Sequence, residues 1–222
     1  NYTRWCNYII EVIKRYHLTP TKILELAAGT GSLAKLLKNN GYHVILMDLN
    51  LAMLKVAQQK LNNSTPLVQG RLTSLPFKGR FEVIICLYDS INYLLEVEQL
   101  KTLFFDIAQL LVPTKGIFIF DTCTEYNSLT YFKNNIETDS GENYFYERKS
   151  IYLKDKKIQL NLFSLVFKEG QIIKKYKEEH CQRIYSHQKM IEIIEETNCF
   201  HFQAYDDFSF GPPHLKSKRI PV

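Results

Sequence analysis

Short apolar runs alternate with amphipathic stretches through the first 121 residues of the chain. The apolar runs cover residues 23–26, 44–47, 67–69, 81–87 and 117–120 and predict buried strands. Before and between them, apolar side chains recur at helical spacing in residues 5–16, 32–39, 50–61 and 100–111. Strands without a polar face that alternate with helices indicate a parallel sheet covered on both sides, the architecture of an α/β protein.

The pattern changes after Asp121. Residues 144–153, 158–167 and 172–185 are long strand-like runs, separated by turn sequences at 154–157 and 169–170. These runs predict an antiparallel meander inserted into the α/β unit. A helix that begins after Ser186 and two strand-like runs, 200–210 and 218–222, then return to the first part of the fold.

The sequence ILELAAGTGSLA at residues 23–34 joins a predicted strand to a helix through small residues. Backbone N–H groups and the helix dipole at such a turn point toward a bound ligand, and Gly29 and Gly31 let it come close. Acidic residues follow other strands, at Asp48, Asp89 and Asp121. Because ligands bind beyond the carboxyl ends of parallel strands, this edge of the sheet is the predicted site.

Two ligand classes fit the loop. The first is a dinucleotide, because the spacing Gly29-x-Gly31-x-x-Ala34 matches a dinucleotide-binding pattern and Asp48 follows 17 residues after Gly31. An NAD(P)-dependent oxidoreductase is therefore one interpretation. Glu25 argues against it, since a carboxylate 4 Å from a diphosphate is repelled by about 1 kcal/mol even in bulk water. S-adenosylmethionine carries a sulfonium and an ammonium and no phosphate. The acid therefore favours methyl transfer over hydride transfer.

The loop from Glu25 to Gly31, Asp48, and the run CLYDSINYL at residues 86–94 resemble the class I S-adenosylmethionine-dependent methyltransferases. The similarity is greatest to the small-molecule branch with sugar N-methyltransferases and glycine N-methyltransferase-like proteins. It implies a Rossmann-like, seven-stranded, mostly parallel sheet with an inserted antiparallel β lid. Residues 1–121 and 186–222 would form the cofactor-binding domain, and residues 122–185 the lid and substrate subdomain.

The resemblance also implies roles for single residues. The loop around the methionine part would be shaped by Ala27, Gly29 and Gly31, with Glu25 supporting the loop and the amino group. Asp48 would hold the ribose hydroxyls. The remaining cofactor contacts would be Leu49 and Met53 near the adenine, Leu87 and Asp89 beside the methionyl group, and Tyr2 and Trp5 as a cover from the N-terminal helix.

Two positions depart from the family pattern. Ala27 stands where many members have a glycine, which is tolerated if its φ angle is negative. Arg71 stands where the family has an aspartate that accepts a hydrogen bond from the adenine amino group, and arginine has no acceptor. Backbone groups from Gly70 to Leu72 would then form the hydrogen bonds to the adenine. A degenerate, non-catalytic binding protein on the same fold therefore remains an alternative.

Methyl transfer from a sulfonium is an in-line displacement that depends mainly on alignment, and a base is needed only if the acceptor is protonated. Asp89, Tyr93 and His180 are the candidate catalytic residues. Packing roles compete with this interpretation, because His180 alternates with polar residues along a predicted strand. No histidine has a partner at metal-ligand spacing, so no metal site is expected.

Composition limits the partners. The net charge is +5, but basic and acidic residues are interspersed, which disfavours a nucleic-acid partner. The five cysteines are widely spaced, as in reduced cytoplasmic proteins, and no apolar run approaches a membrane span. We expect a cytoplasmic monomer or homodimer that methylates a small molecule at N or O. The sequence begins without Met, and further residues are expected before Asn1 and after Val222.

Overall fold

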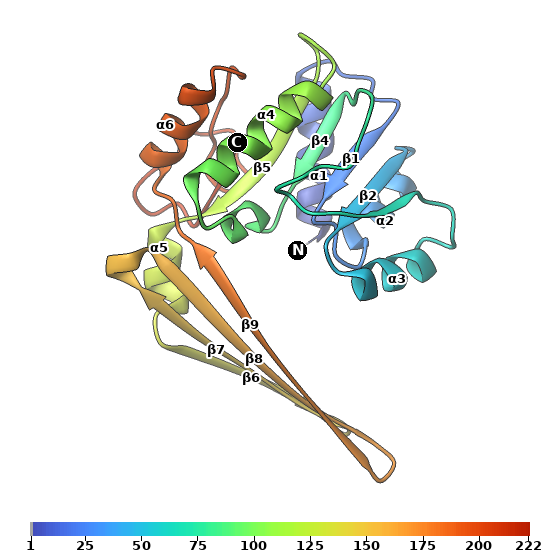
Figure 1. Ribbon diagram of the computed structural model, residues 1–222, viewed down its shortest axis with the longest axis vertical. Coiled ribbons are helices and arrows are strands. Elements are labelled where there is room, and N and C mark those ends of the chain that lie inside the picture. Colours follow the sequence, from blue (N-terminus) through green and yellow to red (C-terminus); the bar gives the residue numbers. More distant parts are fainter. Residues whose placement is uncertain (1) are drawn as a thin grey trace.

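The computed structural model describes residues 2–222 and contains a central six-stranded sheet (Figure 1). Its strands follow the order β10-β5-β4-β1-β2-β3. Five of them are parallel, and β10 runs antiparallel to β5. The strands are β1 (Ile23–Leu26), β2 (Val44–Asp48), β3 (Leu67–Gln69), β4 (Val83–Cys86), β5 (Ile117–Cys123) and β10 (Arg219–Pro221).

Helices cover both faces of this sheet. One face packs against α1 (Tyr2–Arg15), α2 (Ser32–Asn39) and α3 (Leu51–Lys60), and the other against α4 (Val97–Leu110) and α6 (His187–Thr197). Successive strand residues point to opposite faces, so Ile23 joins the first core and Leu24 joins the second. The predicted α/β architecture is confirmed.

The central sheet has six strands among the described residues, so the prediction of seven is wrong. Residues 200–210 do not form a strand, although Tyr205 N and Asp207 N donate to carbonyl oxygens of β10 at 2.9 and 3.0 Å. Asp207 has a φ of 47°, which no extended strand accommodates. The ring of Phe208 packs on Trp5, with centroids 4.6 Å apart, and so holds the turn against α1.

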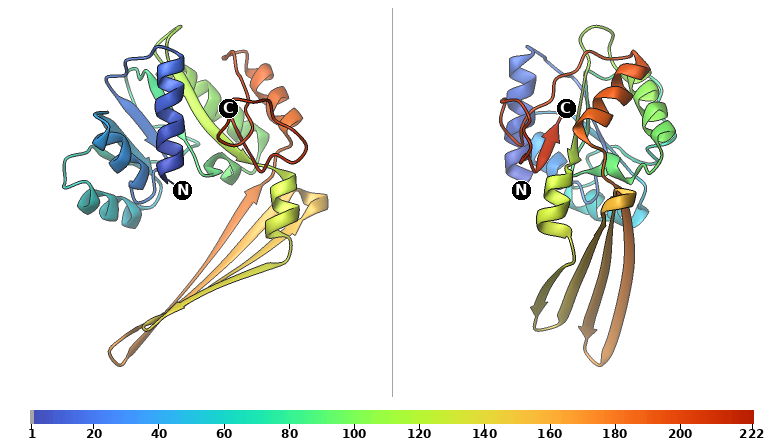
Figure 2. Two further views of the ribbon diagram at one scale, coloured as in Figure 1. Left: turned by 180° about the vertical axis from the view of Figure 1, so that it is seen from behind. Right: turned by 90° about the vertical axis from the view of Figure 1, so that its left-hand side faces the viewer.

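A separate four-stranded antiparallel sheet lies between β5 and α6 in the chain and projects away from the α/β part in every view (Figures 1 and 2). Its order is β6-β7-β8-β9. The strands are β6 (Asn135–Gly141), β7 (Tyr144–Leu153), β8 (Ile158–Glu169) and β9 (Ile172–Arg183). Short helical turns connect the two sheets and strands: α5 (Glu125–Asn127), η2 (Ser128–Phe132), η3 (Lys154–Lys156), and η1 (Ser90–Tyr93), which follows β4.

Buried amides and hydroxyls join the antiparallel sheet to the α/β part. Ser128 Oγ donates to Gln159 Oε1 at 2.8 Å, and Gln159 Nε2 donates to Gln182 Oε1 at 3.3 Å. Gln182 Nε2 in turn donates to the carbonyl of Asp89 at 3.4 Å. The chain of bonds ends at the loop after β4, so the base of the antiparallel sheet is tied to the carboxyl edge of the central sheet. Within residues 2–222, no helix is long and apolar enough to cross a membrane.

Candidate active site

The loop between β1 and α2 is built from left-handed residues. Ala27, Gly29 and Gly31 have φ angles of 51°, 55° and 67°. A Cβ on Gly31 would lie 3.0 Å from Leu46 Cδ2, whereas one on Gly29 would meet no atom within 4 Å. The condition for tolerating alanine at this position, a negative φ, is therefore not met. The tight turn requires the left-handed region there, which costs a non-glycine residue about 1–2 kcal/mol.

Asp48 braces this loop from the end of β2. Its Oδ2 accepts a hydrogen bond from Gly29 N at 2.7 Å, and its Oδ1 accepts one from Asn50 N at 2.8 Å. Asn50 also caps α3, since its side chain accepts from Ala52 N at 2.9 Å. Each carboxylate oxygen keeps a free lone pair, so Asp48 can still accept from a ligand hydroxyl.

Glu25 is a buried carboxyl with an unused acceptor. Its side chain is 6% exposed, and Oε2 has no hydrogen-bond partner. Burial raises the pKa of Glu25 to about 8; the Ala34 N–H opposes this shift, and the charge of Asp48 adds to it. Unpaired buried acceptors are rare, and one beside a ligand-binding turn fits a cationic group.

A pocket of about 750 Å³ opens at the carboxyl edge of the sheet, between β2, β3 and β9. Seven predicted cofactor residues line it: Ala27, Gly29, Asp48, Leu49, Met53, Arg71 and Leu72. Two predicted catalytic residues, Tyr93 and His180, line its other side. The remaining predicted residues lie outside this lining: Tyr2, Trp5, Glu25, Gly31, Leu87 and Asp89. The pocket also includes Gln99, Glu178 and Glu179, which the sequence reasoning missed.

Arg71 borders the pocket from the turn after β3. Ser74 N donates to its carbonyl at 3.1 Å, which closes the turn. Gly70, just before it, packs so tightly that a Cβ would lie 2.7 Å from Met47 Sδ. Among residues 2–222, no carboxylate lies within ion-pair distance of Arg71. The backbone of this turn faces the pocket, and the guanidinium supplies donors only.

Asp89 belongs to a largely buried cluster of three charged residues. Its Oδ2 lies 3.1 Å from Arg219 Nη2, and Arg219 Nε lies 3.2 Å from Oδ2 of the fully buried Asp121. Burial, and then the neighbouring Asp89, raises the pKa of Asp121 well above its usual value. Asp89 Oδ1 and Asp121 Oδ1 have no partner. The cluster therefore offers unpaired acceptors, but its carboxylates share one guanidinium.

The N-terminal helix covers this cluster with aromatic rings. The Arg219 guanidinium lies 5.9 Å from the Trp5 ring centroid and 5.7 Å from that of Tyr88. The Tyr2 ring lies 4.9 Å from Tyr88. Tyr2 and Trp5 thus contact the residues around Asp89.

Tyr93, His180 and Glu178 form a hydrogen-bonded chain at the pocket wall. Tyr93 Oη lies 2.7 Å from His180 Nδ1, and His180 Nε2 lies 3.2 Å from Glu178 Oε2. Burial, and then the charges of Asp89 and Glu178, raises the pKa of Tyr93 to about 12, so the phenol is neutral at pH 7. Glu178 and His180 alternate on β9 and share one face. That spacing was the one signal in the sequence for Glu178.

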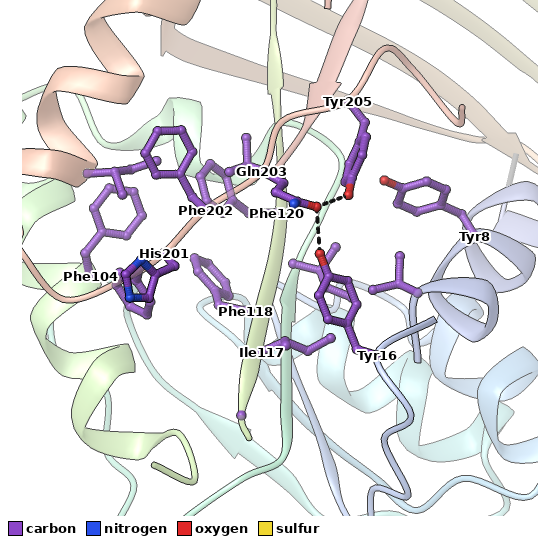
Figure 3. Close-up of a pocket in the computed structure, with 16 residues that line it drawn as sticks. Tyr8, Tyr16, Phe104, Ile117, Phe118, Phe120, His201, Phe202, Gln203 and Tyr205 are labelled. Atoms are coloured by element: carbon purple, nitrogen blue, oxygen red, sulfur yellow. Dashed lines mark hydrogen bonds between the residues drawn. The ribbon is translucent and has the colours of Figure 1, made fainter. Parts of the chain in front are cut away.

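A second cavity of about 280 Å³ lies beside the amino-terminal half of β5, away from the carboxyl edge. Figure 3 shows its aromatic lining, with Gln203 between two tyrosines. Tyr16 Oη donates to Gln203 Oε1 at 2.9 Å, and Tyr205 Oη donates to the same oxygen. It contains no acidic residue and belongs to the packing between α1 and the segment before β10.

Comparison with known proteins agrees with this geometry. A family model described as a methyltransferase domain matches residues 23–114. The chain is 27% identical over 202 residues to the putative methyltransferase YqeM of Bacillus subtilis, covering 90% of this chain and 81% of the relative. The chain therefore contains a methyltransferase domain and is similar to methyltransferases over most of its length.

Solved structures share the fold of this methyltransferase. An S-adenosylmethionine-dependent methyltransferase from Clostridium acetobutylicum superposes with a TM-score of 0.88 at 24% identity, covering all of this chain and 90% of the other. The sugar N-methyltransferase KedS8 from Streptoalloteichus gives a TM-score of 0.79 at 17% identity, covering 100% and 87% of the two chains. At these identities the likeness establishes the architecture, including the projecting antiparallel sheet.

Proposed function

We propose that this methyltransferase transfers a methyl group from S-adenosylmethionine to a nitrogen or oxygen of a small-molecule acceptor. The pocket of about 750 Å³ carries the proposal, because the glycine loop lines one side of it and the Tyr93–His180–Glu178 chain lines the other. The cofactor would enter from the loop side and the acceptor from the side of β9. Residues 122–185 would then serve as the acceptor lid.

The chain's own residues fit a cationic cofactor. Glu25 Oε2 and Asp89 Oδ1 are buried acceptors without partners. An ammonium or a sulfonium nearby would satisfy them, whereas a diphosphate would be repelled, which disfavours the NAD(P) alternative. Asp48 would accept from ribose hydroxyls, and Leu49 and Met53 would pack on the adenine. When bound, S-adenosylmethionine supplies an electrophilic methyl group on sulfur.

Tyr93, His180 and Glu178 would remove the acceptor proton. As the acceptor nitrogen or oxygen attacks, its proton passes to Tyr93 Oη while the phenolic proton moves to His180 Nδ1, 2.7 Å away. Glu178 would stabilise the resulting imidazolium through Nε2. The Asp89 carboxylate is already paired with Arg219, which lies 3.1 Å away. We therefore propose that Asp89 acts beside the methionyl group and that Tyr93, together with His180 and Glu178, acts as the base.

Calorimetry tests the cofactor. We expect S-adenosylmethionine and S-adenosylhomocysteine to bind and NAD not to bind. Binding of NAD alone would establish the oxidoreductase alternative. If none of the three ligands binds, the protein is the degenerate, non-catalytic one that Arg71 suggested.

A matched pair of variants tests the pocket. Gly29→Ala and Gly170→Ala both place a Cβ at a left-handed glycine with no atom within 4 Å, and their φ angles of 55° and 61° give similar backbone strain. Of the two, Gly29 lines the pocket. We expect Gly29→Ala to weaken cofactor binding and Gly170→Ala to leave it unchanged; equal effects would refute this placement.

A further inference from the structure

Tyr93 and His180 lie on two different parts of the fold. Tyr93 ends η1, beside the central sheet, whereas His180 lies on β9, near the point where that strand returns to the α/β part (Figure 1). Tyr93 is 45% exposed, and its hydrogen bond to His180 Nδ1 is open to water. Because water competes for both atoms, such a bond contributes little to holding its own geometry. Other contacts therefore keep the two side chains together.

Backbone hydrogen bonds do not supply these contacts. β9 is an edge strand that pairs with β8. Among residues 2–222, no backbone–backbone hydrogen bond joins residues 89–96 to residues 178–185. Neighbouring strands of a sheet are held in register by such bonds. The placement of Tyr93 against His180 therefore depends on side chains.

Side-chain hydrogen bonds on both sides of Tyr93 provide this placement. Asn92, directly before it, donates from Nδ2 to the carbonyl of Arg183 at 2.7 Å. Leu94, directly after it, has a carbonyl that accepts a hydrogen bond from Tyr185 Oη at 2.7 Å. We call Asn92, Leu94, Arg183 and Tyr185 the junction.

Two side chains of the junction are buried. Asn92 is 0% exposed and Tyr185 is 4% exposed. The other end of the Asn92 amide, Oδ1, accepts from Cys123 N at 3.2 Å, so this one side chain links η1 to both β5 and β9. Away from water, a broken bond leaves a polar group unpaired, which is costly. The junction therefore resists separation in a way that the exposed Tyr93–His180 bond does not.

The junction lies close enough to His180 to set its position. Arg183 and Tyr185 follow His180 by three and five residues along the chain. A slip of one residue at this end of β9 would move His180 by about 3.3 Å. The distance of 2.7 Å between Tyr93 Oη and His180 Nδ1 allows no such slip.

We propose that Asn92 and Tyr185 are positioning residues for the proton transfer assigned to Tyr93 and His180. Neither Asn92 nor Tyr185 lines the pocket, so each acts through the pair that does. Their buried hydrogen bonds hold Tyr93 Oη and His180 Nδ1 at bonding distance before an acceptor arrives, which removes the need to order them during the reaction. This inference rests on the proposed function, because the alignment matters only if the pair moves the acceptor proton.

NMR of the full chain, labelled at the histidine nitrogens, tests the positioning without an acceptor. The chain has six histidines, and the nitrogens of each ring respond to the hydrogen bonds that the ring makes. Tyr93→Phe removes the bond and so identifies the His180 signals. We expect Tyr185→Phe to shift these signals in the same direction as Tyr93→Phe, although it removes only a hydroxyl five residues away.

Tyr152→Phe is the matched control. Tyr152 is 5% exposed and its Oη also donates one hydrogen bond, to Glu125 Oε1 at 3.1 Å. Thermal unfolding should show similar losses of stability for Tyr152→Phe and Tyr185→Phe. The control should nevertheless leave the His180 signals at their wild-type values. Equal shifts in the two variants, or no shift in Tyr185→Phe, would overturn the proposal.

Asn92→Asp gives a second measurement. Its carboxylate keeps an acceptor for Cys123 N but loses the donor for the Arg183 carbonyl, so we expect the His180 signals to shift as in Tyr185→Phe. Unchanged signals in the folded variant would overturn the role of Asn92.

Calorimetry with S-adenosylhomocysteine separates this inference from the proposed function. We expect Tyr185→Phe and Asn92→Asp to keep the wild-type dissociation constant, because neither residue lines the pocket. A wild type that does not bind S-adenosylhomocysteine would overturn the proposed function, while the His180 signals would still decide whether the junction positions the pair.

Discussion

Glu25 is expected to release a proton when S-adenosylmethionine binds. Burial raises the pKa of this carboxyl to about 8. At pH 7 about nine-tenths of the free protein therefore carries it protonated. A sulfonium or ammonium beside Oε2 favours the carboxylate, so binding should ionise Glu25 and release up to one proton per ligand.

This linkage sets the pH dependence of affinity. Below a pKa of about 8 the ionised fraction falls tenfold per pH unit, so affinity should rise up to about tenfold, or about 1.4 kcal/mol, from pH 6 to 7. The ligand's own amino group titrates near pH ~8, which makes this lower range the informative one. Calorimetry in two buffers with different protonation enthalpies measures the protons released.

Glu25→Gln is the matched control, because it keeps the shape and removes the titration. We expect weaker binding without proton release and without the rise from pH 6 to 7. The same substitution should change the stability of the free protein. A raised carboxyl pKa stabilises the fold below the unfolded value of 4.5, and that contribution is lost as the pH rises toward 8.

The loss amounts to at most about 5 kcal/mol across that range. Urea unfolding should therefore show Glu25→Gln gaining stability relative to wild type between pH 5 and 8. Equal proton release by wild type and Glu25→Gln, or a wild-type affinity that does not change between pH 6 and 7, would refute the assignment of Glu25 to the cationic end of the cofactor.

Three further predictions concern the loop, the charge cluster and the catalytic chain. Ala27→Gly relieves a φ of 51°, whereas Ala28→Gly at its buried neighbour relieves no strain, removes a packed methyl group and adds unfolded-state entropy. Urea unfolding should therefore separate the two variants by at least about 1–2 kcal/mol; equal destabilisation would contradict the strain. Arg219→Met leaves Asp89 and Asp121 without their cation, and thermal unfolding should show a loss of about 3–5 kcal/mol, whereas Lys218→Met should change little. Tyr93→Phe should lower turnover with a working acceptor by about 10²-fold or more at an unchanged dissociation constant for S-adenosylmethionine, and weaker cofactor binding with normal turnover would exclude Tyr93 as the proton acceptor.

Local signals in the sequence predicted most of the central fold. Each of β1 to β5 coincides with an apolar run, and Asn50 caps α3 as its position before an amphipathic stretch indicated. These features depend on neighbours within a few residues. The strand predicted at residues 200–210 was wrong because contacts far along the chain decide this segment. A left-handed Asp207 and the packing of Phe208 on Trp5 override its strand-like composition.

The sequence by itself determined the α/β class, the glycine loop and the acidic strand ends, since periodicity and small residues act locally. The tertiary structure alone decided which groups meet. Tyr93 and His180 are 87 residues apart, and Arg219 is 130 residues from Asp89. The first contact arises from how the two sheets pack, and the second from the place of β10 in the central sheet, and spacing along the chain encodes neither. The left-handed φ of Ala27 also became visible only once the backbone was placed.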